Sequence, residues 1–335
     1  MKHRLSIAAL VFFVSTQTFY LHGYEETVSL KWYKGNTHTH TINSDGDSSP
    51  DAVVRWYREH RYNFVVITDH NYLTDVRGLN AIFSAEGKFL VVSGEEVTDS
   101  YESPDSVFSA IHLNAINLSE TIPPAGGESV VETAQNNVDA INAAGALCQL
   151  NHPNFHWSYT AAELDSVNNF SLMEIANYSS ACNDMGGGGY SGSEALWDSL
   201  LTRGRRVYGV ASDDTHDYKE FGPKFDNPGR GWVMVRCREL KVEDIVSALE
   251  GGDFYSSCGV VLEDIQCDGK SITIRMKEKR NLKYTVYFIG KGGKNLAVVN
   301  DNPAVYRIEG REGYVRARVV DSEGKIAWTQ PVFIK

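Results

Sequence analysis

The chain has 335 residues, more than one typical compact domain holds, so we expect a large domain with a smaller appendage. With 42% hydrophobic and 22% charged residues, its composition excludes wholesale disorder. Its formal charge of -11 excludes general nucleic-acid binding, because affinity for a phosphate backbone requires a basic surface or stripe.

The N-terminus begins with the basic stretch Lys2-His3-Arg4, which is followed by an uncharged run over 5–14 and then by polar residues. This order is typical of a secretory signal, and the apolar run is about half of the roughly 20 residues that span a bilayer. We therefore expect residues 1–23 to be a signal peptide of a periplasmic or secreted protein. No membrane insertion is expected after signal removal. The alternative is a cytoplasmic chain with an apolar extension, and N-terminal sequencing of the mature protein distinguishes the two.

Short apolar runs that end in polar residues recur between Lys34 and Arg236, and their lengths suit buried parallel strands. The runs cover 64–67, 89–92, 110–116, 146–150, 172–176, 207–210 and 232–235. Helix candidates lie between them, the clearest being 51–60, which the capping sequence Ser48-Ser49-Pro50 precedes. This alternation predicts a β/α barrel over residues 24–260, with functional groups at the carboxyl ends of its strands.

After a helix candidate over 242–250, the pattern changes to short alternating strands over 271–276, 284–289 and 315–320. Turns are expected at Asp268-Gly269 and Glu323-Gly324. In the last strand, Val315, Ala317 and Val319 should face inward, whereas Arg316 and Arg318 should face water. Residues 261–335 are thus predicted to form a small all-β domain, with a structural role favoured over ligand binding.

Five cysteines are scattered along the chain without the CxxC spacing of a zinc knuckle or a redox pair. We expect most of them to be buried thiols. Cys258 and Cys267 are the closest pair in sequence, and whether they form a disulfide stays open.

Six of the ten histidines lie at the ends of predicted strands or in tight polar motifs. They are His38, His40, His70, His112, His152 and His216. A single histidine is more often structural than a ligand, but packing alone does not explain so many at strand ends, and imidazole is the commonest metal ligand. The repeated placement therefore predicts a metal centre.

Spacing and oxygen donors support this prediction. His38 and His40 are two residues apart, so on an extended strand both face the same side, and Asp214 and His216 repeat that spacing. Asp45 and Glu96 would complete the donor set. Glu96 is favoured over Glu95 by its Gly-x-Glu register, and Asp214 over Asp213 by its spacing to His216.

The ordered motifs HxH, SDG, TDH, GxE, His112, Asn151-His152-Pro153 and DxH resemble the polymerase and histidinol phosphatase (PHP) superfamily. The resemblance covers residues 38–216. The segment ending Ala327-Trp328-Thr329-Gln330-Pro331 is also similar to the CehA/McbA-type branch, whose members are often exported. The superfamily resemblance implies a distorted seven-stranded, TIM-like (β/α)7 barrel that holds up to three divalent cations, which we expect to be Zn, Mn or Fe.

By this resemblance, His38, His40, Glu96 and Asp214 would hold one cation. Glu96 would bridge to a second cation at His112 and His152, and Asp45, His70 and His216 would hold the third. Some relatives have histidine where this chain has Asp45, and the harder oxygen ligand there could change metal preference or occupancy.

A water that bridges two cations loses a proton near neutral pH and becomes the nucleophile, while the cations stabilise the developing charge. The sequence thus predicts a hydrolase of small-molecule phosphate esters, either monoesters or diesters, with Asp214 and Glu96 at the reacting centre. Arg230 could bind a phosphate oxygen, although a surface ion pair is an equal alternative. His156, Trp157 and Tyr178 could line the pocket or pack in the core, and His60 should be structural.

Two other functions remain open. A metal-activated water can also attack a carboxylic ester or a carbamate, and the branch resemblance would permit this activity. The chain could instead be a non-catalytic metal-binding envelope protein. The nine matching ligands argue against that second alternative, whereas only a comparison of substrates decides the first.

Overall fold

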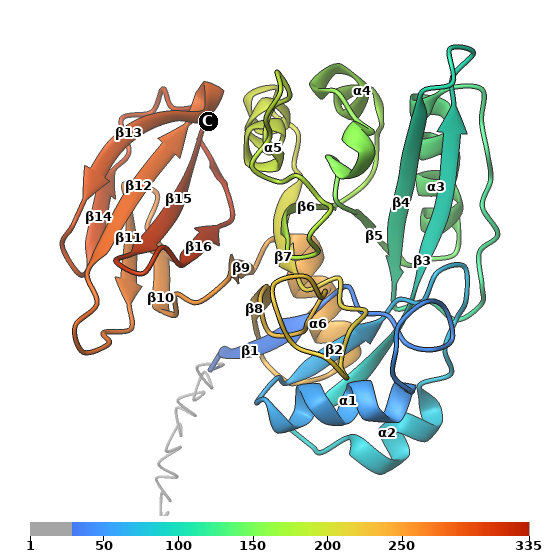
Figure 1. Ribbon diagram of the computed structural model, residues 1–335. Helices are drawn as coiled ribbons and strands as arrows, with labels where there is room; N and C mark the ends of the chain where they lie inside the picture. Colours follow the sequence, from blue (N-terminus) through green and yellow to red (C-terminus); the bar gives the residue numbers. More distant parts are fainter. Residues whose placement is uncertain (1–28, 335) are drawn as a thin grey trace, which may run out of the picture.

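The computed structural model describes residues 29–334 as a mixed α/β structure (Figure 1). The predicted signal peptide, residues 1–23, lies outside the described residues. The elements up to the last helix are β1 (Lys31–Asn36), α1 (Pro50–Glu59), β2 (Phe64–Ile67), α2 (Arg77–Phe83), β3 (Leu90–Glu102), β4 (Phe108–Ile116), α3 (Val130–Ala143), β5 (Leu147–Leu150), the 3-10 turn η1 (Phe155–Trp157), α4 (Ala161–Ser166), β6 (Leu172–Asn177), α5 (Ser193–Thr202), β7 (Tyr208–Ser212), β8 (Trp232–Cys237) and α6 (Val242–Gly251).

The remaining elements are strands and one short turn. They are β9 (Phe254–Ser257), β10 (Leu262–Cys267), β11 (Ser271–Met276), β12 (Tyr284–Gly290), the 3-10 turn η2 (Lys291–Gly293), β13 (Lys294–Val299), β14 (Ala304–Arg307), β15 (Tyr314–Asp321), β16 (Ile326–Thr329) and β17 (Val332–Phe333). The expected turns are present, because Gly269 and Gly324 adopt positive φ angles of 78° and 82° between paired strands.

Most strands belong to one 14-stranded sheet in the order β13-β12-β15-β16-β9-β8-β1-β2-β3-β4-β5-β6-β7, with β17 beside β15. The pairs β1–β2, β2–β3, β5–β6 and β6–β7 are parallel, as predicted. β4, however, runs antiparallel to both β3 and β5. The expectation of uniformly parallel strands is wrong here, because residues 90–116 form one long hairpin.

Strand pairing does not close the sheet into the distorted barrel that the sequence predicts. The edge of β1 opposite β2 pairs with β8 from Lys31 to Gly35, so β7 cannot form a ladder there. Beyond the end of β1, a single parallel bridge joins Thr39 to Thr215, which follows β7. The chain after β1 and the chain after β7 therefore meet only beyond the carboxyl ends of these two strands.

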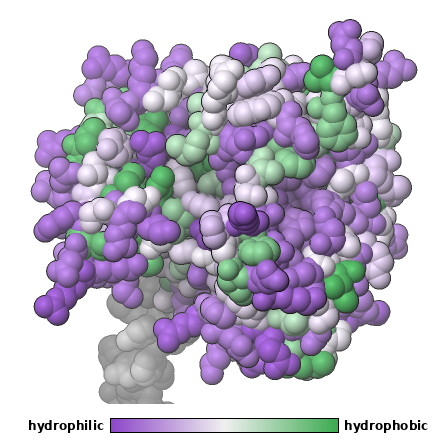
Figure 2. Space-filling model, viewed as in Figure 1, coloured by the Kyte–Doolittle hydropathy of each residue, from purple (hydrophilic) through white to green (hydrophobic). Residues whose placement is uncertain are grey.

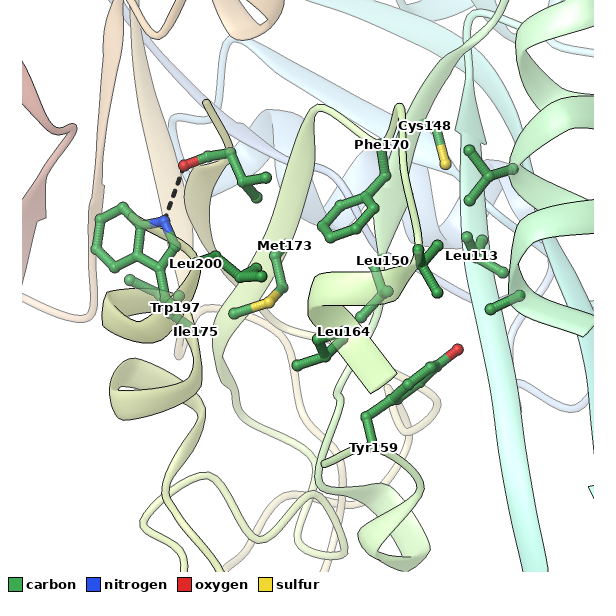
Figure 3. Close-up of a cluster of buried hydrophobic side chains, with 14 of the residues drawn as sticks. Leu113, Cys148, Leu150, Tyr159, Leu164, Phe170, Met173, Ile175, Trp197 and Leu200 are labelled. Carbon is green, nitrogen blue, oxygen red and sulfur yellow. Dashed lines mark hydrogen bonds between the residues drawn. The ribbon is translucent and has the colours of Figure 1, made fainter. Parts of the chain in front are cut away.

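Helices α3, α4 and α5 pack on β4–β7 through a core that Figure 3 shows in part, including Leu113, Leu150, Met173 and Leu164. Trp197 of α5 is fully buried there, and its indole Nε1 donates a hydrogen bond to the Val207 carbonyl at 2.8 Å. Burying side chains of this size stabilises the fold by about 1.5–3 kcal/mol each. This core fixes the strands whose ends carry the polar motifs.

Helix α1 begins at Pro50, as its sequence predicts, but the Ser49 hydroxyl makes no capping bond to the helix backbone. It donates instead to the Asp51 carboxylate at 2.6 Å. Helix α6 ends before Gly252, whose φ of 77° is the left-handed conformation that glycine favours.

The C-terminal strands enclose a core that also includes Tyr255 of β9, so they are not separate from the main sheet. Val315, Ala317 and Val319 are fully buried in that core, as predicted. The strands continue the main sheet through the β9–β16 pair, and Figure 1 shows α5 between them and α4. Coverage of β15 by α5 explains one error: Arg316, which we expected to face water, is buried and pairs with Asp198, whereas Arg318 is partly exposed.

All five cysteines are free, and Cys267 is the one that is exposed. Cys258 and Cys267 therefore do not form the disulfide that the sequence left open. None of the helices within residues 29–334 has the length and hydrophobicity that a membrane crossing requires. The face shown in Figure 2 is largely hydrophilic, with hydrophobic groups in small separate patches.

Candidate metal centre

The segment that follows β1 holds His38 and His40 on one side of the extended backbone. The Asn36 side chain donates to the His38 carbonyl (3.1 Å) and to Thr39 Oγ1 (2.9 Å), and the Thr39 amide donates to Thr68 Oγ1 (2.9 Å). With Thr39 held in this way, both imidazoles are fully buried, with ring centres 5.1 Å apart. The predicted shared face of this pair is present.

Glu96 lies at the centre of the cluster and reaches both groups of imidazoles. Its Oε2 lies 3.2 Å from His38 Nε2, 3.3 Å from His40 Nε2 and 3.0 Å from His70 Nδ1. Its Oε1 lies 3.2 Å from His112 Nδ1 and 3.3 Å from His152 Nε2. The two oxygens of one carboxylate thus face two different sets of nitrogen donors, which is the arrangement of a bridging ligand.

Glu96 and His112 lie within β3 and β4, and not at strand ends as we expected. The long hairpin places them near each other because Glu96 pairs with Asn114, two residues from His112. Gly94 is required at the start of this motif, since a Cβ there would lie 2.8 Å from Val66 Cγ1. Glu95 points away and accepts a hydrogen bond from the Ile122 amide at 2.9 Å, so Glu96 enters the cluster and Glu95 does not.

Asp214 approaches from the opposite side, after β7. Its Oδ1 lies 3.1 Å from both His38 Nε2 and His40 Nε2. Its backbone φ of 47° is left-handed, a conformation that aspartate tolerates better than most residues. The preceding Asp213 faces the other way and accepts from the amides of Gly229, Arg230 and Gly231. The DxH spacing therefore identified the carboxylate that joins the cluster.

Asp45, His70 and His216 form an outer group around His40. Asp45 Oδ1 lies 3.3 Å from His216 Nε2, and its Oδ2 lies 3.5 Å from His70 Nε2. The ring of His216 stacks on that of His40 with centroids 4.2 Å apart. The Asp45 side chain remains 55% exposed, so this group lies nearest to solvent.

The structure brings all nine predicted ligand residues together. They fall into four overlapping groups whose donor atoms lie within 4.8 Å of one another. The groups are His40, Asp45, His70 and His216; His38, Glu96 and His152; His38, His40 and Asp214; and His70, Glu96 and His112.

Several donor atoms in these groups are buried without a hydrogen-bond partner. Among them are His38 Nε2, His40 Nε2, His112 Nδ1 and Glu96 Oε2. Buried polar atoms are rarely left unpaired, and lone pairs that converge in this way are suited to a cation. The mixed nitrogen and oxygen donors fit zinc, manganese or iron.

The charges of the cluster are strongly coupled. Burial alone would lower the pKa of His70, but Glu96 and Asp45 raise it to about 10. Burial alone would raise the pKa of Glu96, yet the neighbouring His38, His70 and His112 hold it well below its usual value. Without cations His70 and Glu96 therefore favour an imidazolium–carboxylate pair, so protons and cations compete for these atoms.

A cavity of about 380 Å³ opens onto the cluster. Its lining comprises Asp45, His70, Glu96, His112, His152, Phe155, Ser179, Ala181, Cys182, Asp214, His216 and Asp226. No lysine or arginine occurs among these lining residues of the described chain. Phe155 and Ala181 provide an apolar wall beside the polar cluster.

The secondary candidates lie elsewhere. The Arg230 guanidinium donates to the Gly222 carbonyl at 2.7 Å and to Asn227 Oδ1 at 3.0 Å, and it does not line the cavity. Neither His156, Trp157 nor Tyr178 lines the cavity. His60 stacks on Trp56 with ring centroids 3.8 Å apart, in keeping with a structural role.

Sequence reasoning overlooked Glu174, a fully buried carboxylate that accepts a hydrogen bond from His38 Nδ1 at 2.8 Å. The residue lies in the apolar run of β6, Leu172–Asn177. A charged residue inside an apolar strand is almost never buried without partners, and this was the signal that could have identified it.

No family model matches the chain, and no curated protein matches its sequence. Similar solved structures include a two-domain protein from Bacteroides vulgatus that contains a predicted PHP-like metal-dependent phosphoesterase. It is 16% identical, with 90% of this chain and 96% of that chain covered and a TM-score of 0.48.

Two further structures are less similar. A protein from Bifidobacterium adolescentis, whose proposed activity is that of a metal-dependent phosphoesterase, is 12% identical, with 56% of this chain and 88% of that chain covered and a TM-score of 0.39. An amidohydrolase from Chromobacterium violaceum with bound sulfate and no metal is 13% identical, with 57% and 93% covered and a TM-score of 0.38. All three TM-scores lie below 0.5.

Proposed function

We propose that the chain is a metal-dependent hydrolase of the PHP superfamily that acts on small-molecule phosphate esters. The observation that carries this proposal is the position of Glu96, whose two oxygens face separate sets of imidazoles. The facing nitrogens of His38, His40 and His112 are buried without a hydrogen-bond partner. A buried carboxylate in this position is suited to bridge two cations, and the outer group around Asp45 is suited to a third. Zinc, manganese and iron fit the donors.

The roles of the chain's own residues follow from their positions. His38, His40 and Asp214 would hold one cation against Glu96, and His112 and His152 would hold the second. Divalent cations bound there supply Lewis-acid chemistry, since they lower the pKa of a water and stabilise developing negative charge. The cavity above the cluster, of about 380 Å³, gives a small ester access to these positions.

A carboxylic ester or carbamate is the second candidate substrate. The observation in its favour is the absence of lysine and arginine among the residues that line the cavity within the described chain. A dianionic phosphate would be bound by the cations alone, whereas a neutral ester needs no further positive charge. The wall formed by Phe155 and Ala181 also suits an apolar substituent.

For the test, metal-free protein is reconstituted with zinc, manganese or iron. Elemental analysis then measures how many metal ions each protein chain holds. Turnover is then compared for nitrophenyl phosphate, bis-nitrophenyl phosphate and nitrophenyl acetate. We expect metal-dependent hydrolysis of at least one phosphate ester and a preference for it over the acetate. A preference for nitrophenyl acetate would contradict the phosphoesterase proposal. If the protein bound no metal in the presence of excess zinc and manganese, the proposed metal centre would be refuted.

A matched pair of variants connects activity with the cluster. Glu96→Gln should lower kcat/KM by at least about 100-fold, equivalent to about 2.7 kcal/mol of transition-state stabilisation. Glu95→Gln is the control, because that neighbouring buried carboxylate faces the Ile122 amide instead. Equal activity in the two variants would contradict the role of Glu96.

We further propose the domain division and the location of the protein. β1 to β7 would be the seven strands of a distorted barrel that stays open between β1 and β7, within residues 24–260. Residues 261–335 would be the all-β appendage. Residues 1–23 would direct export to the periplasm or the medium. Mass spectrometry of the mature protein tests the last point, because an intact N-terminus would contradict it.

A further inference from the structure

The carboxylate of Glu174 lies behind the cluster, on the side of His38 opposite the cavity ligands. Its Oε1 accepts from His38 Nδ1 at 2.8 Å, from Ser212 Oγ at 2.5 Å and from Gln149 Nε2 at 3.2 Å. The other imidazole nitrogen, His38 Nε2, faces Glu96 and Asp214. One buried ring thus connects Glu174 directly with the candidate metal site.

The second oxygen of Glu174 reaches two further parts of the cluster. Its Oε2 accepts from the His152 amide at 2.7 Å and from Asn177 Nδ2 at 2.8 Å. The same Asn177 amide group lies 3.0 Å from Asp214 Oδ2. Glu174 therefore contacts His38 and His152 directly and reaches Asp214 through Asn177. These three proposed ligands follow the strands β1, β5 and β7.

We propose that Glu174 is a positioning residue that holds the His38 proton on Nδ1 and thereby directs the Nε2 lone pair at a cation. This inference rests on the proposed function, because it assumes that His38 is a ligand. An ionised carboxylate only accepts hydrogen bonds, and its four other neighbours, Gln149, His152, Asn177 and Ser212, all donate to it. The His38 Nδ1 atom, at 2.8 Å, must then carry the proton that Glu174 accepts. Carboxylates that orient a ligating imidazole in this way commonly affect metal affinity by 10- to 100-fold.

The alternative is that Glu174 only connects β5, β6 and β7. If its role were only structural, a variant of Glu174 would be less stable. The position of the His38 proton and the affinity for metal would not change. The substitution Glu174→Gln distinguishes the two roles, because glutamine keeps the size of the side chain but replaces one acceptor oxygen by an NH2 donor. If that NH2 faces His38, it can donate to Nδ1, so the imidazole proton would move to Nε2 and block the ligand atom.

The first measurement is proton NMR of the His38 Nδ1–H, assigned by its loss in His38→Gln. In the wild-type protein, with or without zinc, we expect a downfield, slowly exchanging proton, because it is buried and bonded to a carboxylate. In Glu174→Gln this resonance should move upfield or disappear. The wild-type spectrum tests the proposal even if the variant fails to fold, since absence of this proton would overturn it.

The second measurement is zinc affinity by competition with a chromophoric chelator. Glu174→Gln should bind zinc about 10- to 100-fold more weakly than wild type. The control is Glu312→Gln, which removes another buried carboxylate that accepts from Tyr306 Oη and from the amides of Glu309 and Gly310, among the C-terminal strands. Zinc affinity of this control should equal that of wild type.

The outcomes are distinguishable. Wild-type zinc affinity and an unchanged His38 proton in Glu174→Gln would overturn the positioning role while leaving the metal centre intact. A wild-type protein that shows the downfield proton but binds no zinc would overturn the proposed function, and the orientation of His38 by Glu174 would still be supported.

Discussion

Arg316 of β15 and Asp198 of α5 form a buried ion pair that joins the C-terminal strands to the helix beside β6 and β7. The Arg316 Nη2 atom lies 2.6 Å from Asp198 Oδ2, and Nε lies 2.8 Å from Oδ1. Glu194 adds a second carboxylate, 2.8 Å from Nη2, and the guanidinium packs 4.8 Å from the Trp197 ring centre. The C-terminal strands are therefore held to α5 by a buried ion pair, in addition to their pairing with the main sheet.

Arg316→Ala should lower the free energy of unfolding by about 3–5 kcal/mol, because it leaves Asp198 and Glu194 without their buried cation. Urea denaturation of metal-free protein measures the change. Arg311→Ala, which removes an exposed pair with Glu309, is the control and should cost about 1 kcal/mol or less. Similar losses in both variants would contradict the structural importance of the buried pair.

Asp45→Ala should remove about one bound cation per chain and leave the others in place, because Asp45 belongs to the outer group alone. Elemental analysis after dialysis against zinc or manganese measures the occupancy. Since the Asp45 side chain is half exposed, the unfolding free energy of the metal-free protein should change little. A full complement of metal in this variant would contradict the assignment of Asp45 as a ligand.

Arg230→Ala should affect stability more than catalysis. The guanidinium holds the loop through Gly222 and Asn227, so its removal should cost about 1.5–3 kcal/mol of unfolding free energy. We expect kcat/KM for a small ester to change by less than about threefold, or under about 0.7 kcal/mol. A large loss of kcat/KM at unchanged stability would instead support the phosphate contact that the sequence suggested.

Asp184 should make the unfolding free energy depend on pH. Burial raises its pKa to about 7, although it accepts from the Asn177 amide and Ser193 Oγ. Between about pH 4 and pH 7 the folded chain therefore binds this proton more tightly than the unfolded chain does. The contribution to stability is full below about pH 4 and is lost as the pH rises to about 7.

The variant Asp184→Asn removes this titration. The unfolding free energy of the variant relative to that of wild type should increase by at most about 4 kcal/mol between about pH 4 and pH 7. Above about pH 7 this difference should stay constant. Urea denaturation at several pH values, with a chelator present, measures the difference. Asp139→Asn, at an exposed position, is the control, and a difference for Asp184→Asn that does not vary with pH would refute the prediction.

The local sequence pattern predicted an element well where its residues form a continuous apolar run or alternate regularly between apolar and polar. β2 and β11 have the bounds that their apolar and alternating runs indicate, and β15 differs by one residue at each end. The motif spacings also selected Glu96 over Glu95 and Asp214 over Asp213, because strand neighbours face opposite ways. Spacing thus predicted the two pairs and the choice of carboxylates, and the resemblance to the PHP superfamily implied the complete set of nine ligands.

What the sequence did not reveal depends on partners that are distant along the chain. Strand pairing between β1 and β8 leaves the sheet open, and nothing local in either strand indicates that pairing. Arg316 alternates with apolar residues as an exposed side chain would, and its burial depends on Asp198, more than a hundred residues earlier. Glu174 was overlooked for the same reason, since four of its five donors lie outside β6.

The pairing of β9 with β16 has a consequence for dissecting this protein. A fragment that stops at residue 260 would leave the β9 edge, including Tyr255 and Ser257, without its neighbour, and Gly209 would lose both hydrogen bonds to Gln330. Exposed strand edges recruit other copies of a chain. Such a fragment should accumulate as aggregates, so we expect the segment that holds the proposed metal centre to need a substitute for the last strands.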